Sequence, residues 1–153
     1  MEKLELKIPP VAVFLIAVLM MSYIAKNMPF ADLRLPLSGT VFLACLIVSS
    51  IVALSGVKEF RRVKTTVNPV KPETASQVVD SGIFAHTRNP MYLGLFILLF
   101  GIGYWQQNGL SLAVSFGFIW YMNRFQIAAE ERALETLFGI DYVEYKQRVR
   151  RWV

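Results

Sequence analysis

Apolar residues are gathered in long uninterrupted stretches, and the first two of these predict membrane helices. The first stretch runs from Pro10 to Ile24, and the second runs from Leu37 to Val57 without any Asp, Glu, Lys or Arg. A helix that crosses a bilayer needs about 20 apolar residues, so the second stretch is the clearer span and the first is slightly short. With flanking residues included, we expect transmembrane helices over 8–28 and 35–57.

The third and fourth apolar stretches are shorter and lie close together. They cover Met91–Trp105 and Leu110–Met122, and the turn-like sequence Gln106–Gly109 separates them. Because each is short for an upright span, we expect the two to form a tight helical hairpin over 90–123. Glycines suit close contacts between membrane helices, and the alternative is that they reflect the general enrichment of glycine in such helices. Those along this hairpin are Gly94, Gly101, Gly103 and Gly117.

Charged residues interrupt the apolar pattern in the last part of the chain. Apolar positions from Phe125 to Phe138 are interleaved with Glu and Arg at helical spacing, which predicts an amphipathic helix leaving the membrane. Gly139 fits the position just after the end of that helix. Asp141 and Glu144 have the spacing of a capping box that would start a last helix from Tyr142 to about Arg150. We therefore expect C-terminal cytosolic helices over 124–153.

Together these segments predict an all-α, polytopic integral membrane protein of one domain with four transmembrane helices. Hydrophobic residues make up 55% and charged residues 18% of the 153-residue chain, against about 45–50% and about 25% in soluble domains. A soluble globular protein is nearly excluded, because a helix in water needs a polar face.

The distribution of basic residues favours one orientation in the membrane. The irregular loop 58–88 carries six Lys and Arg residues, the segment 124–153 carries six more, and the turn Gln106–Gly109 carries none. By the positive-inside rule, four spans would place both termini in the cytosol, and the small size suggests a prokaryotic inner membrane. A cleaved signal peptide is the alternative for the first stretch, although no small-x-small cleavage site follows Ile24.

Charge and residue counts exclude several other classes of site. The net charge of +5 is accounted for by this topology, so we expect no nucleic-acid partner. Cys45 is the single cysteine and His86 the single histidine, which leaves no disulfide within the chain, no cluster with metal-ligand spacing and no obvious Ser-His-Asp triad.

The sequence from Gly82 to Gly94 is the first candidate site. Asn89 is a good N-cap and Pro90 a good first helical residue. The free N–H groups of a helix start, next to Arg88, would suit a carboxylate or phosphate. The alternative is that this segment is only a well-made helix start.

The second candidate is the carboxylate pair Glu130–Glu131, which follows the fourth apolar stretch closely. One of the two would face the helix bundle and bind a hydroxyl or a cation, or both would belong to a solvated helix face. Helical geometry allows either to point inward, because neighbouring residues lie about 100° apart. Aromatic residues near the same membrane face are interfacial anchors or a stacking surface for an adenine or a sulfonium. They are Tyr92, Tyr142, Tyr145 and Trp152.

In combination these motifs resemble the isoprenylcysteine carboxyl methyltransferase and phospholipid methyltransferase superfamily. The Gly82–Gly94 block, the Glu130–Glu131 pair and the sequence Phe138-Gly139-x-x-Tyr142-x-x-Tyr145 follow the family's order, and the resemblance covers about residues 75–153. It implies an integral membrane enzyme that binds S-adenosylmethionine on the cytosolic side. The implied acceptor is lipophilic: an isoprenylcysteine carboxylate, a phospholipid amine, or a small hydrophobic thiol or acid.

The resemblance also implies which residues hold the cofactor. They are His86, Arg88, Asn89, Pro90, Tyr92, Gly94, Glu130, Glu131, Tyr142 and Tyr145. Glu130 and Glu131 are also the catalytic candidates, since a buried carboxylate with a raised pKa would take a proton from an ammonium acceptor. This chain has Asn89 where the family has His, and an Asn side chain hydrogen-bonds but does not titrate near pH 7. His86 is a candidate to replace that histidine.

Two other functions compete with a methyltransferase. A nicotinamide-dependent membrane reductase would share a similar C-terminal helical region, although membrane sterol reductases are much larger. A non-catalytic membrane scaffold would use its Lys and Arg clusters to bind anionic lipid head groups. The scaffold predicts no binding of S-adenosylmethionine.

Overall fold

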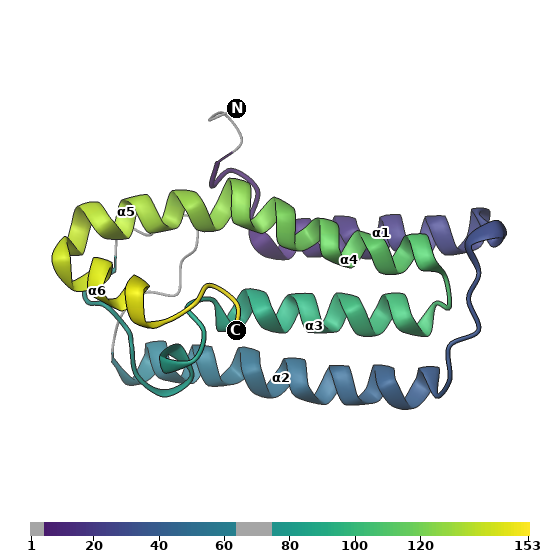
Figure 1. Cartoon of the computed structure of the whole chain (residues 1–153), viewed down its shortest axis with the longest axis horizontal. Helices are drawn as coiled ribbons and strands as arrows, with labels where there is room; N and C mark the ends of the chain where they lie inside the picture. The colour runs from purple at the N-terminus through teal and green to yellow at the C-terminus, as the bar shows by residue number, and fades with distance from the viewer. Residues whose placement is uncertain (1–4, 64–74) are drawn as a thin grey trace.

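The computed structural model describes residues 5–63 and 75–153, and over these ranges the protein is built from helices (Figure 1). The longer helices are α1 (Pro10–Asn27), α2 (Ser38–Arg62), α3 (Pro90–Trp105), α4 (Gly109–Tyr121), α5 (Ala128–Phe138) and α6 (Ile140–Arg148). The described ranges contain no strand, and only an isolated bridge joins Asp32 to Asn108. The all-α prediction is therefore confirmed.

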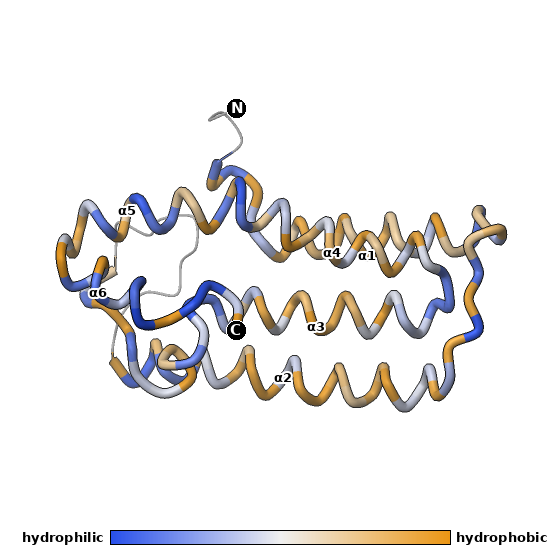
Figure 2. The backbone as a smooth tube through the Cα atoms, viewed as in Figure 1, coloured by the Kyte–Doolittle hydropathy of each residue, from blue (hydrophilic) through white to orange (hydrophobic). Residues whose placement is uncertain are grey.

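Helices α1 and α2 are long and apolar enough to cross a membrane. Their outer surfaces carry large apolar side chains, with Leu19 71% exposed and Leu54 66% exposed. Figure 2 shows that apolar residues dominate the parallel helices, whereas hydrophilic residues gather around α5, α6 and the adjoining loops. The protein thus has an apolar bundle with a polar assembly at one end.

The first four helices lie side by side, and α3 has α2 on one side and α4 on the other (Figure 1). Glycines permit this close packing as expected at three positions. A Cβ at Gly101 would lie 2.6 Å from Cβ of Cys45 on α2, and one at Gly94 would lie 3.0 Å from the Cβ of Ala53. At Gly103 it would meet Leu112 of α4.

The expectation for Gly117 is wrong. No described atom lies within 4 Å of the position that its Cβ would occupy, because this face of α4 borders open space. Close helix contact therefore explains Gly94 and Gly101, which face α2, and Gly103, which faces α4. It does not explain Gly117.

Asn108 organises the end of the bundle that lies away from α5 and α6. Its side-chain oxygen accepts hydrogen bonds of 3.1 Å from the backbone N–H groups of Leu110 and Ser111, which caps α4. Its side-chain nitrogen donates to the carbonyl oxygen of Met28 at 3.0 Å and to Asp32 at 3.1 Å. This one fully buried amide joins the hairpin turn to the loop between α1 and α2.

At the opposite end, α4 continues without a break into α5 through a π-helical segment, η5 (Met122–Ile127). The residues before α1 pack against this segment: the N–H of Leu6 donates to the carbonyl oxygen of Phe125 at 3.2 Å, and Glu5 pairs with Arg124 at 2.9 Å and with Arg132. The π-helical turn matters because its wider backbone changes which residues of the following helix face inward.

Three local expectations need correction. Helix α2 continues past Val57 to Arg62, so its last turn lies in what was expected to be loop. Asn89 does occupy the N-cap position of α3, but its side chain makes no capping bond and instead donates to the carbonyl oxygen of Arg151 at 3.0 Å. Helix α6 starts at Ile140, because Gly139, at φ +56°, turns the chain there without help from a capping box.

Candidate functional site

A cavity lies at the polar end of the bundle, where the start of α3 faces α5 and α6. The space between its lining residues, counted together with the part that is open to solvent, is about 840 Å³. The described residues that line it are Phe60, Ala75, Gln77, Val78, Val79, Phe84, Arg88, Asn89, Pro90, Met91, Tyr92, Ile127, Glu130, Glu131, Leu134, Phe138, Tyr142 and Tyr145.

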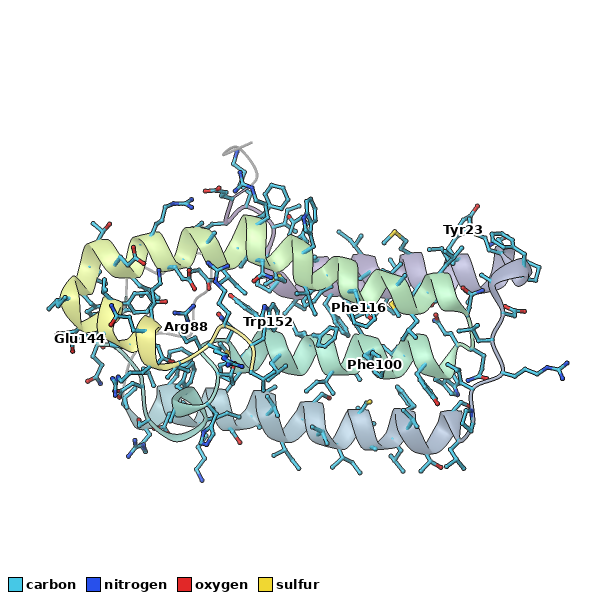
Figure 3. All side chains as sticks on the ribbon, viewed as in Figure 1. Tyr23, Arg88, Phe100, Phe116, Glu144 and Trp152 are labelled. Atoms are coloured by element: carbon cyan, nitrogen blue, oxygen red, sulfur yellow. The ribbon has the colours of Figure 1, made fainter. Side chains whose placement is uncertain are left out.

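Arg88 lies two residues before α3 and lines the cavity. Figure 3 shows it in the space between α5, α6 and the start of α3. Its side chain is 8% exposed. One terminal nitrogen, Nη2, donates to Oε1 of Glu131 at 2.8 Å, and Nη1 donates to the carbonyl oxygen of Lys146 at 3.2 Å. The buried Nε has no partner among the described residues. It is therefore a donor to which an anionic ligand could bond.

Glu131 is the centre of an ionic cluster. Besides Arg88, it accepts from Arg151 through Nε at 2.9 Å and Nη2 at 2.6 Å, and Nζ of Lys146 lies 3.8 Å away. Burial alone would raise the pKa of Glu131, but the hydrogen bond from Arg151 and the charges of the three basic groups lower the pKa overall. Glu131 is therefore ionised at neutral pH and fully engaged with protein cations.

Glu130 has a different environment, although it is the adjacent residue. The hydroxyl of Tyr92 donates to Oε1 at 2.5 Å, and Nε2 of Gln126 donates to the same oxygen at 2.6 Å. Burial raises the pKa of Glu130 to about 7, against the opposing effect of these two donors. No salt bridge links Glu130 to a cation in the described part of the chain.

The structure thus answers which glutamate faces the cavity: both do, in different states. Glu131 is a permanent anion held by Arg88 and Arg151. Glu130 is a carboxyl group poised between its neutral and ionised forms at physiological pH. Two adjacent carboxyl groups with separated pKa values are an arrangement suited to proton transfer.

Tyr142 and Tyr145 form the wall contributed by α6. Both are buried, at 6% and 3% exposure, and their ring centroids lie 6.0 Å apart. The hydroxyl of Tyr145 donates to the carbonyl oxygen of Phe84 at 2.8 Å, which fixes α6 to the loop segment before α3. Burial raises the pKa of both phenols above the ordinary value, so both are neutral. The wall is aromatic and uncharged.

The opposite wall is fastened to the end of α2. Glu59 accepts hydrogen bonds from Ser81 at 2.5 Å and from Nε of Arg62 at 3.0 Å. Gly82 follows at φ +58°, and a Cβ there would lie 2.9 Å from Oε2 of Glu59. Only glycine allows the chain to pass this closely, so Gly82 brings Phe84 of the short 3₁₀ helix η4 (Gly82–Ala85) to the cavity.

The C-terminal segment after α6 runs beside the start of α3. The carbonyl oxygen of Arg150 accepts from the N–H of Arg88 at 3.0 Å, and that of Arg151 accepts from the side chain of Thr87 at 3.2 Å. Trp152 donates from Nε1 to Asn123 at 3.1 Å. Figure 1 shows the chain end lying against the start of α3. This segment supplies Arg151 to the ionic cluster.

Most of the residues expected to form the site surround this cavity, and two do not. Arg88, Asn89, Pro90, Tyr92, Glu130, Glu131, Tyr142 and Tyr145 line it. His86 is exposed and does not line the cavity, while Gly94 lies in the contact between α3 and α2. Sequence reasoning also missed the apolar lining and, among the side chains that bind Glu130 and Glu131, three polar ones. They are Gln126, Lys146 and Arg151.

A family model described as phospholipid methyltransferase matches residues 38–141. An uncharacterized protein of Haemophilus influenzae is 46% identical over 63 residues, which are 41% of this chain and 100% of that protein.

Other relatives carry the names of enzymes. The protein-S-isoprenylcysteine O-methyltransferase of Saccharomyces cerevisiae is 33% identical over 79 residues, which are 52% of this chain and 33% of the yeast protein. Protein-S-isoprenylcysteine O-methyltransferase B of Arabidopsis thaliana is 29% identical over 107 residues, 70% of this chain and 54% of the plant protein. The matched part therefore spans between about a third and about half of the length of these two enzymes.

Proposed function

This chain belongs to the phospholipid methyltransferase family, and from that premise we propose that it is a membrane methyltransferase that uses S-adenosylmethionine and acts on a lipophilic acceptor. The observation that carries the proposal is the cavity at one end of an apolar helical bundle. It brings together a buried arginine, an uncompensated carboxyl group and an aromatic wall. A water-soluble cofactor and a bilayer-soluble acceptor would meet at such a place.

We propose four membrane spans, α1 to α4, with the polar end and both termini in the cytosol. The length and composition of α1 and α2 support the first two spans. Support for the orientation comes from the basic residues at the polar end, which include Lys146 and Arg151 of the ionic cluster. The cavity would then open to the side from which the cofactor comes.

The residues present fit the charged and aromatic parts of S-adenosylmethionine. The unpartnered Nε of Arg88 would bind the carboxylate of its methionine part. Glu130 would accept a hydrogen bond from an ammonium or a ribose hydroxyl. Tyr142 and Tyr145 offer aromatic faces for the adenine or for the sulfonium. Asn89 lines the same cavity, but its side chain is occupied by the backbone of Arg151.

When bound, S-adenosylmethionine supplies a methyl group that is already activated by a sulfonium leaving group. The task of this chain is then to align the two reactants and to exclude water. The buried walls formed by Phe84, Tyr145 and Ile127 would perform that exclusion.

Proton transfer separates the candidate acceptors. An ammonium acceptor must lose a proton before it can be methylated, and Glu130, with a pKa raised to about 7, would take it. A carboxylate acceptor is ionised already and requires no base. We therefore propose that Glu130 has a proton-accepting role if the acceptor is an amine or a thiol, and that it only binds the cofactor if the acceptor is an isoprenylcysteine-like carboxylate.

Ligand binding to the purified protein in nanodiscs tests the function most directly. We expect S-adenosylmethionine and S-adenosylhomocysteine to bind in calorimetry, and Arg88→Ala and Glu130→Ala to weaken binding by at least about tenfold, or about 1.4 kcal/mol. Ser111→Ala is a matched control, because its buried hydroxyl bonds to the backbone of Met21 at the other end of the bundle.

Each competing function predicts a different result in the same assay. A lipid-binding scaffold would bind neither S-adenosyl compound but would bind anionic vesicles. A reductase would bind a reduced nicotinamide dinucleotide instead. The family match favours the methyltransferase over both of these alternatives.

A further inference from the structure

Gln126 is a buried amide that has no role in the function proposed above. It lies in the π-helical segment η5, is 2% exposed, and follows the buried Phe125. Ile127, the next residue, belongs to the apolar core together with Met122. Burying an amide among apolar side chains costs free energy unless hydrogen bonds replace those to water. The position of Gln126 therefore calls for a partner.

Glu130 is that partner, and it is held from two separate elements. Gln126 donates to Oε1 from the helical turn before Glu130, at 2.6 Å, and Tyr92 donates to the same oxygen from α3, at 2.5 Å. No hydrogen bond from a described residue reaches Oε2 of Glu130, and Glu130 lines the cavity. Two donors that converge on one oxygen fix the plane of the carboxyl group and leave the other oxygen for an occupant of the cavity.

We infer that Gln126 is a positioning residue of the site, which acts with Tyr92 to hold Oε1 of Glu130 so that Oε2 meets the cationic or proton-donating part of the bound ligands. The inference rests on the proposed function, because it assumes that cofactor and acceptor occupy this cavity. Gln126 itself does not line the cavity and acts only through Glu130.

The charges near Glu130 explain why neutral hydrogen-bond donors, Gln126 and Tyr92, hold its carboxyl group. The groups that affect the pKa of Glu130 are Tyr92 on α3, Gln126 in η5 and Glu131 on the same helix, and Glu130 in turn acts on Tyr142 of α6. Arg88 is committed to Glu131, so it does not neutralise Glu130. Gln126 and Tyr92 stabilise the ionised carboxylate without supplying an opposite charge. The negative charge on Glu130 therefore stays available for a ligand.

Gln126 lies in the π-helical turn that leads from α4 into α5. The N–H of Leu6 bonds to the carbonyl oxygen of Phe125, next to Gln126, which supports a turn whose backbone groups are displaced from the α-helical pattern. Gln126 and Glu130 are four residues apart, and the hydrogen bond between their side chains shows that both lie on the same face.

The inference is tested by two readouts on the protein in nanodiscs. The first is the infrared band of the protonated carboxyl group of Glu130, followed between pH 5 and pH 9 and assigned by its absence in Glu130→Gln. The second is the affinity for S-adenosylmethionine over the same pH range. The variants are Gln126→Met, which keeps the volume but removes the donor, and Tyr92→Phe. Ser111→Ala serves as the control for loss of a buried hydrogen bond elsewhere.

We expect the midpoint of the Glu130 band to move upward by about one pH unit in Gln126→Met and in Tyr92→Phe, because each loses one donor to the ionised form. Affinity for S-adenosylmethionine at pH 6 should fall by about tenfold in both variants and recover partly at pH 8. Ser111→Ala should leave the midpoint and the affinity unchanged. If Gln126→Met fails to fold, Gln126→Asn gives the same test, because its shorter side chain does not reach Glu130.

An unchanged midpoint in Gln126→Met, with unchanged affinity, would overturn the inference and reduce Gln126 to a packing residue. The failure of the proposed function looks different. In that case the wild-type protein would bind neither S-adenosyl compound at any pH, while its carboxyl band still titrated and still responded to Gln126→Met.

Discussion

Arg88, just before α3, and Arg151, in the C-terminal tail, bind the same carboxylate. That carboxylate belongs to Glu131. Arg88 reaches Oε1 of Glu131 at 2.8 Å and Arg151 reaches Oε2 at 2.6 Å. Arg88 is deeply buried and lines the cavity, whereas the side chain of Arg151 is 38% exposed and lies behind it. The Glu131 carboxylate therefore links Arg88, which lines the cavity, to Arg151, which lies outside it.

Removal of Arg88 should be the more damaging of the two changes. Arg88→Met leaves Glu131 buried with one strong partner fewer, and the loss of one member of a buried ion pair costs about 3 kcal/mol. We expect a clearly lower melting temperature and no measurable binding of S-adenosylhomocysteine. Arg151→Met should cost less stability, because solvent replaces part of its contact, and should reduce affinity without abolishing it. Equal effects of the two substitutions would contradict this division.

The pH dependence of stability should carry the signature of Glu130. Its pKa is raised to about 7 in the folded protein from an ordinary value of 4.5, so the folded state binds the proton more tightly than the unfolded state does. Stability is then lost as pH rises through this interval, by up to about 3 kcal/mol. Glu130→Gln should remove the loss. Melting temperatures at pH 5 and pH 8 check this, and a wild type that tracks Glu130→Gln at both values would refute it.

Tyr145→Phe tests the link between α6 and the loop before α3. The substitution removes the donor to the carbonyl oxygen of Phe84 and should lower stability by about 1 kcal/mol. The effect should be local, with faster hydrogen exchange in α6 and in η4. Tyr142→Phe is the comparison, since it keeps that bond. Uniformly faster exchange throughout the bundle would argue against a local tie.

Gly101 should tolerate no side chain. A Cβ would lie 2.6 Å from Cβ of Cys45, so Gly101→Ala must push α2 and α3 apart at a cost of about 1–3 kcal/mol. Gly117→Ala, with open space around it, should change stability little. Thermal unfolding of the two variants in one detergent compares them directly. A Gly117→Ala variant as unstable as Gly101→Ala would show that helix propensity or lipid contact matters more than packing.

The helices were predictable because their determinants are local. Long apolar runs and a Pro at the first helical position place α2 and α3 close to where they were expected. The start of α6 was not predicted, because a glycine at positive φ supplies it and no side-chain cap does. Residues 64–74 of the expected cytosolic loop 58–88 lie outside the described residues.

The site was predictable only in part, for a physical reason. The Glu130–Glu131 pair and Tyr142 carry a recognisable spacing, but their roles depend on partners that are distant in the sequence. A lone Gln126 within a helix resembles any polar helical residue, and Arg151 in a basic tail resembles a membrane-orienting charge. Their functions become visible only when folding brings each of them to a glutamate of α5.

Asn108 has a consequence for how the molecule would move. Its amide joins α4 to the carbonyl oxygen of Met28 and to Asp32 at the end of the bundle opposite the cavity. The loops there are tied together, while the cavity end contains the ionic cluster around Glu131, in which Lys146 and Arg151 are partly exposed. Motions that admit a ligand should therefore have their largest amplitude near α6 and smallest near Asn108, so that the bundle spreads from one end only. Backbone amides around Asn108 are then expected to exchange hydrogen slowest, whether or not a ligand is bound.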